Sequence, residues 1–159
     1  MEERGVPGPE GAPDIRVRIY RPSAETGLPV TVYLHGGGFV VGGLDTHDNA
    51  VRLLAEQAGT IAVSVDYRLA PEHRFPAAVE DAFAAYAWAL ANAAELGGDP
   101  ERVAVAGDSA GGFLAACTGL LAAERGLPAP LFQLLVYPGT GASPAAGSPP
   151  RRGPTPPAG

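Results

Sequence analysis

Short runs of apolar, often β-branched residues alternate along this chain with segments in which apolar residues recur at helical spacing. Four runs are expected to be buried strands, at 30–34, 60–65, 102–106 and 131–137. Three segments are expected to be helices, at 47–58, 77–96 and 110–124. Since parallel strands are joined by right-handed crossovers through helices, this order predicts an α/β fold with a mostly parallel sheet and helices on both faces.

The two ends of the chain differ from this pattern. Residues 15–20 alternate apolar and polar side chains, which predicts a strand with one face in solvent. Residues 1–13 are rich in Gly, Pro and Glu and are expected to be a disordered leader. In 139–159, 15 of 21 residues are Gly, Pro or Ala and none is large and apolar, so we expect a disordered tail. The folded domain is therefore predicted at 14–138.

Composition excludes several classes of partner. The net charge of -6 and the scattered arginines provide no basic surface for nucleic acid. No run reaches the roughly 18 to 20 apolar residues that span a bilayer. Cys117 is the only cysteine, which excludes an intrachain disulfide, and the N-terminus lacks the pattern of a secretory signal. We expect a cytoplasmic protein with no nucleic-acid partner and no membrane span; its oligomeric state stays open.

The segment GDSAGG at 107–112 contains a G-x-S-x-G pattern between a predicted buried strand and a predicted helix. Small residues at Gly107 and Gly111 would let the strand and the helix approach each other in a strained turn, so that the Ser109 hydroxyl projects into the crevice. The pattern predicts Ser109 as a nucleophile.

The segment HGGG at 35–38 directly follows the first buried strand. Three glycines allow backbone N–H groups to point at a developing oxyanion without interference from side chains. The N–H of Ala110, at the start of the helix after Ser109, would supply a further donor together with the positive end of the helix dipole. Because ligands bind at the carboxyl ends of parallel strands, both Gly-rich loops are expected to meet at one site.

Three motifs in order, HGGG at 35–38, DYRLAPEHRFPAA at 66–78 and GDSAGG at 107–112, resemble the hormone-sensitive lipase family of α/β-hydrolases, which includes bacterial carboxylesterases and acetyl-hydrolases. The resemblance covers about 14–138. It implies the N-terminal portion of an α/β-hydrolase fold. It also implies hydrolysis of a carboxylic ester through an acyl-serine intermediate, with no organic cofactor and no metal; the substrate would be a small-molecule ester whose acyl length stays open.

The resemblance also implies roles for single residues. Ser109 would be the nucleophile, and the oxyanion donors would be Gly37, Gly38 and Ala110. Supporting positions would be His35, Gly36, Gly107, Asp108 and Gly111. His35 is expected to hold the loop by hydrogen bonding. Structural roles are expected for Asp66, Tyr67 and Arg68, while Glu80 and Asp81 are explained by the dipole of the helix they open.

The partners that a catalytic serine needs are missing from this pattern. A serine hydroxyl requires an imidazole as base and a carboxylate that orients the imidazole, and in α/β-hydrolases both follow the serine. No histidine follows Ser109, and the only later acid is Glu124. His47 is expected to be a surface residue at a helix cap, and His73 to lie in a structural loop. We therefore expect hydrolysis by this chain to be impaired.

Two other interpretations stay open. One is a non-catalytic module that binds a small ligand, as in the gibberellin receptors of plants, which resemble the same family. The other is one half of a split esterase whose partner chain supplies the acid and the histidine.

The change of composition after codon 138, into Gly, Pro, Ala and Arg, is typical of a GC-rich gene read in a shifted frame. We expect a truncated or frameshifted product. Reading the other frames of the gene downstream of codon 138 should show the missing Asp and His motifs, and their absence from every frame would contradict this interpretation.

Overall fold

The computed structural model describes residues 1–139, and in this part of the chain it forms a six-stranded sheet of order β1-β2-β4-β3-β5-β6. The strands are β1 Glu2–Val6, β2 Ile15–Tyr20, β3 Leu28–Leu34, β4 Ile61–Asp66, β5 Gly98–Asp108 and β6 Gln133–Val136. β2 is antiparallel to both of its neighbours, whereas β4, β3, β5 and β6 are parallel. The predicted α/β class with a mostly parallel sheet is confirmed.

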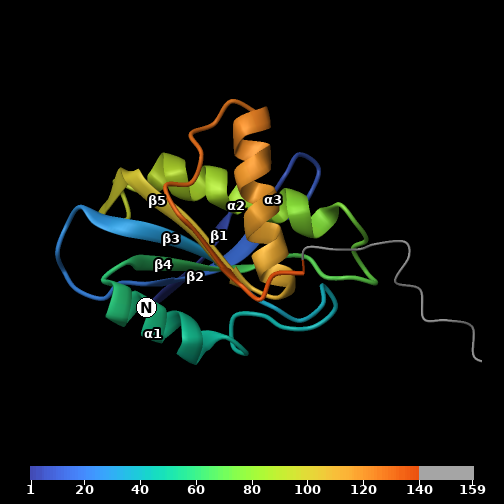
Figure 1. Cartoon of the computed structure of the whole chain (residues 1–159), viewed down its shortest axis with the longest axis horizontal. Coiled ribbons are helices and arrows are strands. Elements are labelled where there is room, and N and C mark those ends of the chain that lie inside the picture. Colours follow the sequence, from blue (N-terminus) through green and yellow to red (C-terminus); the bar gives the residue numbers. More distant parts are fainter. Residues whose placement is uncertain (140–159) are drawn as a thin grey trace, which may run out of the picture.

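Helices cover both faces of the sheet, as predicted (Figure 1). They are α1 Asp48–Ala58, α2 Ala77–Asn92 and α3 Ala110–Glu124. α1 packs against β2 and β4, while α2 and α3 pack together on the opposite face. Across residues 1–139, none of these helices has the length and apolar character needed to cross a membrane.

The alternation of side chains in β3 builds two separate apolar layers. Val30, Val32 and Leu34 are completely buried in the larger core under α2 and α3. Tyr33 belongs to the smaller cluster under α1, with Tyr20, Val51, Ala55, Ala62 and Ala106. A strand with apolar residues on both faces must be covered on both sides, which explains the continuous run at 30–34.

The N-terminal residues correct one prediction. Instead of a disordered leader throughout 1–13, β1 forms the edge of the sheet and pairs with β2 from Glu2 opposite Ile19 to Val6 opposite Ile15. Its charged side chains find distant partners: Glu3 contacts Arg18, and Arg4 contacts Glu95 at 3.2 Å. Such partners cannot be read from local sequence. The predicted disordered tail falls, apart from Gly139, on 140–159, outside the described residues.

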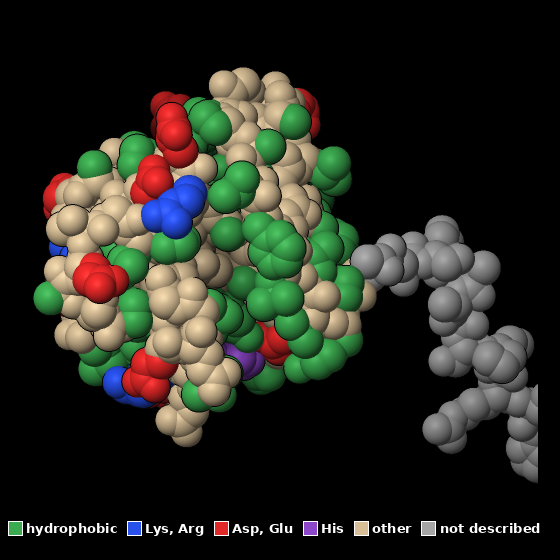
Figure 2. All heavy atoms as spheres, turned by 60° about the vertical axis from the view of Figure 1, so that its left-hand side comes forward, with side chains coloured by type: hydrophobic (Ala, Val, Ile, Leu, Met, Phe, Trp, Pro, Cys, Tyr) green, Lys and Arg blue, Asp and Glu red, His purple; other side chains and the backbone are tan. Residues whose placement is uncertain are grey.

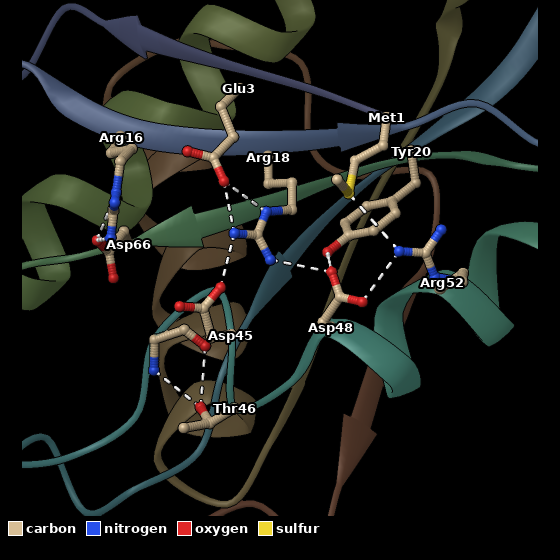
Figure 3. A network of polar contacts seen from close by, with 11 residues as sticks. Met1, Glu3, Arg16, Arg18, Tyr20, Asp45, Thr46, Asp48, Arg52 and Asp66 are labelled. Atoms are coloured by element: carbon tan, nitrogen blue, oxygen red, sulfur yellow. Dashed lines mark hydrogen bonds and ion pairs between the residues drawn. The ribbon is translucent and has the colours of Figure 1, made fainter.

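Arg18 is the second departure from prediction, because it is 9% exposed although it lies on the expected solvent face of β2. Its guanidinium binds Glu3, Asp45 at 2.7 Å and Asp48 at 2.9 Å (Figure 3). The Tyr20 hydroxyl donates to the same Asp48 carboxylate at 2.6 Å and is the main cause, ahead of Arg52 and Arg18, that lowers the pKa of Asp48 to about 2. This network, the Arg18 cluster, joins β1, β2 and the start of α1.

The opposite edge of the sheet exposes apolar side chains. β6 pairs with β5 along one side, and around it Leu131, Phe132, Leu134 and Tyr137 are exposed. In Figure 2 hydrophobic side chains gather on the side of the molecule next to the start of the grey trace. Within residues 1–139, no strand covers the outer side of β6.

Replacing Arg18 by Met should lower the free energy of unfolding by about 2 kcal/mol, because the apolar stem is kept while the carboxylates of the cluster lose their shared cation. The control is Arg16→Met, which breaks the more exposed pair with Asp66 and should cost less than about 0.5 kcal/mol. Urea denaturation followed by circular dichroism measures both. Equal midpoints for the two variants would contradict the role given to Arg18.

Candidate active site

The two Gly-rich loops meet because β3 and β5 are neighbours in the sheet. The first turn of α3 comes so close to the end of β3 that a Cβ placed on Gly111 would lie 1.8 Å from the Leu34 carbonyl oxygen. A Cβ on Gly107 would lie 2.4 Å from the Gly111 carbonyl carbon. These contacts confirm the predicted close approach of strand and helix at Gly107 and Gly111.

Ser109 occupies the turn between β5 and α3 in a strained backbone conformation, with φ 52° and ψ -114°. A non-glycine residue in such a conformation carries a cost of order 1–3 kcal/mol and persists only where the surroundings hold it. Here its N–H donates to the Val136 carbonyl of β6 at 2.9 Å. The prediction of a strained turn at Ser109 is confirmed.

The carboxylate of Asp108 joins the two loops. Its Oδ1 accepts the Gly36 N–H at 3.0 Å and the Tyr33 hydroxyl at 2.8 Å, and lies 3.4 Å from His47 Nε2. A side chain at position 36 is excluded, because a Cβ there would lie 2.2 Å from Asp108 Oδ2. Burial, and then the bond to Asp108, raise the pKa of Tyr33, which keeps its hydroxyl a donor.

His35 is completely buried at the start of the glycine loop. Its Nδ1 lies 2.8 Å from the Gly36 carbonyl oxygen, and because a carbonyl only accepts, the proton is assigned to Nδ1. Tyr67 stacks on the ring at 4.2 Å and donates its hydroxyl to the His35 carbonyl at 2.6 Å. Burial lowers the pKa of His35, so the ring is neutral and held in place.

The glycine loop continues through Gly37 and Gly38, which have φ angles of 127° and 62°. The N–H groups of Val40 and Val41 both donate to the Gly37 carbonyl at 3.1 Å, which closes the loop into a tight turn. The N–H groups of Gly37 and Gly38 have no acceptor among residues 1–139. They are therefore free to donate to a ligand.

His47 lies nearer the site than the sequence suggested. It is the residue before α1, as expected, but its side chain is 21% exposed and its ring centroid lies 5.5 Å from that of His35. The neighbouring Thr46 closes a turn, because its hydroxyl oxygen accepts the Gly43 N–H at 3.0 Å. No spacing in the sequence signals this position, because the loop after Gly38 folds back on the sheet. None of the histidine rings of residues 1–139 is hydrogen-bonded to the Ser109 hydroxyl.

An apolar pocket of about 390 Å³ opens beside the glycine loop. It is lined by Gly38, Phe39, Arg68, Ala70, His73, Phe75, Pro76, Ala78, Val79 and Phe113. Its one permanent charge, Arg68, is neutralised by Asp81, whose carboxylate it binds at 2.7 Å. Asp81 is completely buried and also accepts the Arg68 N–H, so the explanation of Asp81 by the helix dipole was incomplete. No group of side chains in the described part of the chain could hold a metal ion.

Replacing Gly111 by Ala should lower the free energy of unfolding by roughly 2–3 kcal/mol, because the new methyl group meets the backbone of Leu34. Gly119→Ala, on the same helix, is the matched control: its methyl group meets the flexible end of Gln133, and helix propensity favours alanine. Chemical denaturation compares the two variants. A Gly111→Ala variant as stable as Gly119→Ala would show that the close approach does not constrain the fold.

The chain is similar to known esterases over most of its length. A model of the α/β-hydrolase fold family matches residues 31–155, which runs past the expected end of the resemblance near 138. A carboxylesterase of Mycobacterium tuberculosis, NlhH, is 57% identical over 141 residues, covering 88% of this chain and 44% of the relative. The ethyl acetate hydrolase of Pseudomonas putida is 48% identical over 131 residues, covering 80% and 41%.

Solved structures agree. A hyperthermophilic esterase from the archaeon Pyrobaculum calidifontis superposes with a TM-score of 0.83 at 53% identity, over 86% of this chain and 44% of that one. The chain thus spans less than half the length of the relatives it matches. The sequence motifs, the parallel sheet and these similarities together show that the chain belongs to the α/β-hydrolase fold family.

Proposed function

We propose that this chain carries the nucleophile and the oxyanion hole of a carboxylic ester hydrolase, with Ser109 attacking the ester carbonyl to give an acyl-serine. The observation that carries the proposal is the strained turn at Ser109, next to a glycine loop in which the N–H groups of Gly37 and Gly38 are unpaired within residues 1–139. The relatives named as carboxylesterase and ethyl acetate hydrolase support the same chemistry.

The oxyanion hole is proposed to consist of the N–H groups of Gly37, Gly38 and Ala110. Donors that are fixed before the reaction stabilise the charge that develops on the carbonyl oxygen and need no reorganisation in the transition state. Asp108 and His35 support this arrangement: Asp108 binds the Gly36 N–H, while the His35 ring binds the Gly36 carbonyl. Both the N–H and the carbonyl of Gly36 are thus fixed by hydrogen bonds. Gly107 and Gly111 keep the turn of Ser109 close to the loop.

The substrate is proposed to be a small, uncharged ester. The pocket beside Gly38 is apolar, and its arginine already has a buried carboxylate partner, so a charged acyl or alcohol group would find no counter-ion there. Phe39 and Phe113 meet edge to face at 5.9 Å on the side of the pocket next to the loop, and the Phe113 N–H donates to the Ser109 carbonyl. The proposed pocket therefore adjoins the proposed nucleophile.

Proton transfer limits the proposed activity of this chain. Attack by Ser109 requires a base, and no histidine of residues 1–139 is bonded to its hydroxyl. Oxyanion stabilisation and binding without the triad leave about 10³ to 10⁴ over the rate in water in other serine hydrolases. The same observation favours one second candidate, the binding of a small ligand without turnover.

The proposed location is the cytoplasm, since the one cysteine, Cys117, forms no disulfide within the chain.

Hydrolysis of p-nitrophenyl acetate and butyrate by the purified chain tests this proposal. A slow rate above the buffer rate is expected for the wild type and for the control Ser23→Ala, an exposed serine in the turn between β2 and β3. Ser109→Ala should abolish it, with circular dichroism confirming that both variants fold. An unchanged rate in Ser109→Ala would overturn the assignment of the nucleophile. A folded wild type with no activity that still binds the ester would favour the ligand-binding candidate.

A further inference from the structure

We propose that His47 is a positioning residue of the oxyanion loop, acting through Asp108. The claim about loop order stands on geometry alone, and its kinetic consequence rests on the function proposed above. The starting point is the ring of His47, whose Nε2 faces Asp108 Oδ1 at 3.4 Å. The same oxygen accepts the Gly36 N–H at 3.0 Å, so one atom connects His47 with the glycine loop.

The charge of Asp108 explains why a third donor matters. Its side chain is 14% exposed, so water contributes little to its solvation, and the Tyr33 hydroxyl and the Gly36 N–H are both neutral donors. A partly buried carboxylate without enough donors is costly and reorients toward water. With its proton on Nε2, His47 turns an N–H dipole toward this carboxylate from 3.4 Å, a longer and weaker contact than the other two, whereas an unprotonated nitrogen there would set two lone pairs against each other.

The position of His47 is itself fixed from two directions. On its ring, Nδ1 lies 2.9 Å from the Thr46 hydroxyl, which closes the turn with Gly43. Along the backbone, Asp45 and Asp48 flank it, and both bind Arg18 (Figure 3). The Arg18 cluster thus holds the residues on either side of His47 in place. The His47 ring in turn lies next to the carboxylate of Asp108, the residue before Ser109.

These contacts form a continuous connection from β2, through residues 45–48 and Asp108, to the N–H of Gly36. Gly36 directly precedes the proposed donors Gly37 and Gly38. A small movement of the loop would displace these donors from the oxyanion, and oxyanion donors act mainly in the transition state. His47 therefore orders the loop without contacting the substrate.

Hydrogen exchange of the loop tests the proposal directly. Three variants are compared with the wild type: His47→Leu removes the donor, His47→Gln keeps an N–H at a similar reach, and Glu80→Gln breaks a more exposed ion pair, with Arg125, away from the loop. In His47→Leu, amide exchange in a peptide covering 34–41 should be about tenfold faster than in the wild type. The exchange rates of other peptides from β3, β4 and β5 should stay unchanged. His47→Gln and Glu80→Gln should stay within about twofold of the wild type.

Two results would overturn the proposal: unchanged loop exchange in His47→Leu, or equally fast exchange in His47→Gln despite an intact fold. Kinetics add a second readout where the wild type shows Ser109-dependent hydrolysis. There kcat should fall about tenfold in His47→Leu with KM within about twofold, and His47→Gln should restore it. A wild type without Ser109-dependent hydrolysis would contradict the proposed function alone, because the exchange experiment would still decide the role of His47.

Discussion

The close contact between the first turn of α3 and the end of β3 is the constraint on which the rest of the site depends. There is no space for a side chain at Gly111, because the Leu34 carbonyl lies where a Cβ would stand. The contact brings the turn of Ser109 against the glycine loop and turns the Ser109 backbone into a strained conformation. Strain of this size survives only because the surrounding sheet is rigid and buried on both faces. The core beneath α2 and α3 therefore holds the backbone of the Ser109 turn in its strained conformation.

The buried and partly buried carboxylates around this contact all have polar or charged partners. The Asp108 carboxylate accepts hydrogen bonds from Tyr33 of β3 and from Gly36 of the glycine loop and lies 3.4 Å from the His47 ring, while Asp81 binds Arg68. These contacts offset charges that would otherwise face the proposed substrate. What remains around the pocket is apolar, and what remains at the loop are unpaired N–H groups of residues 1–139. This combination suits the proposed substrate, a neutral ester whose carbonyl oxygen becomes negative during the reaction.

Sequence periodicity predicted most of the elements because each has one or two apolar faces that must be buried. The helices agree within a few residues at their starts and ends, and β3 and β4 agree with their predicted buried strands within two residues. β5 begins at Gly98 rather than at 102. The prediction of a buried strand at 131–137 was wrong in its burial, because β6 is the last strand of the described sheet and none of its residues is buried. The main error was β1, whose sequence Glu2–Val6 carries charges typical of a loop. Those charges are compensated by Arg18 and Glu95, which lie far away along the chain. Local composition therefore gave a wrong prediction for β1, because this strand is stabilised by ion pairs between residues far apart in the sequence.

The sequence by itself determined the α/β class, the meeting of two Gly-rich loops and the identity of the residues in the strained turn, since these depend on periodicity and on the small size of glycine. Only the tertiary structure decided which polar groups face one another. His47 comes to Asp108, and Arg18 becomes buried among carboxylates, because a loop folds back across the sheet and β1 adds a further edge strand. The physical reason is that hydrogen bonds and ion pairs depend on distances of a few ångströms between segments remote in sequence, and no local pattern encodes those distances.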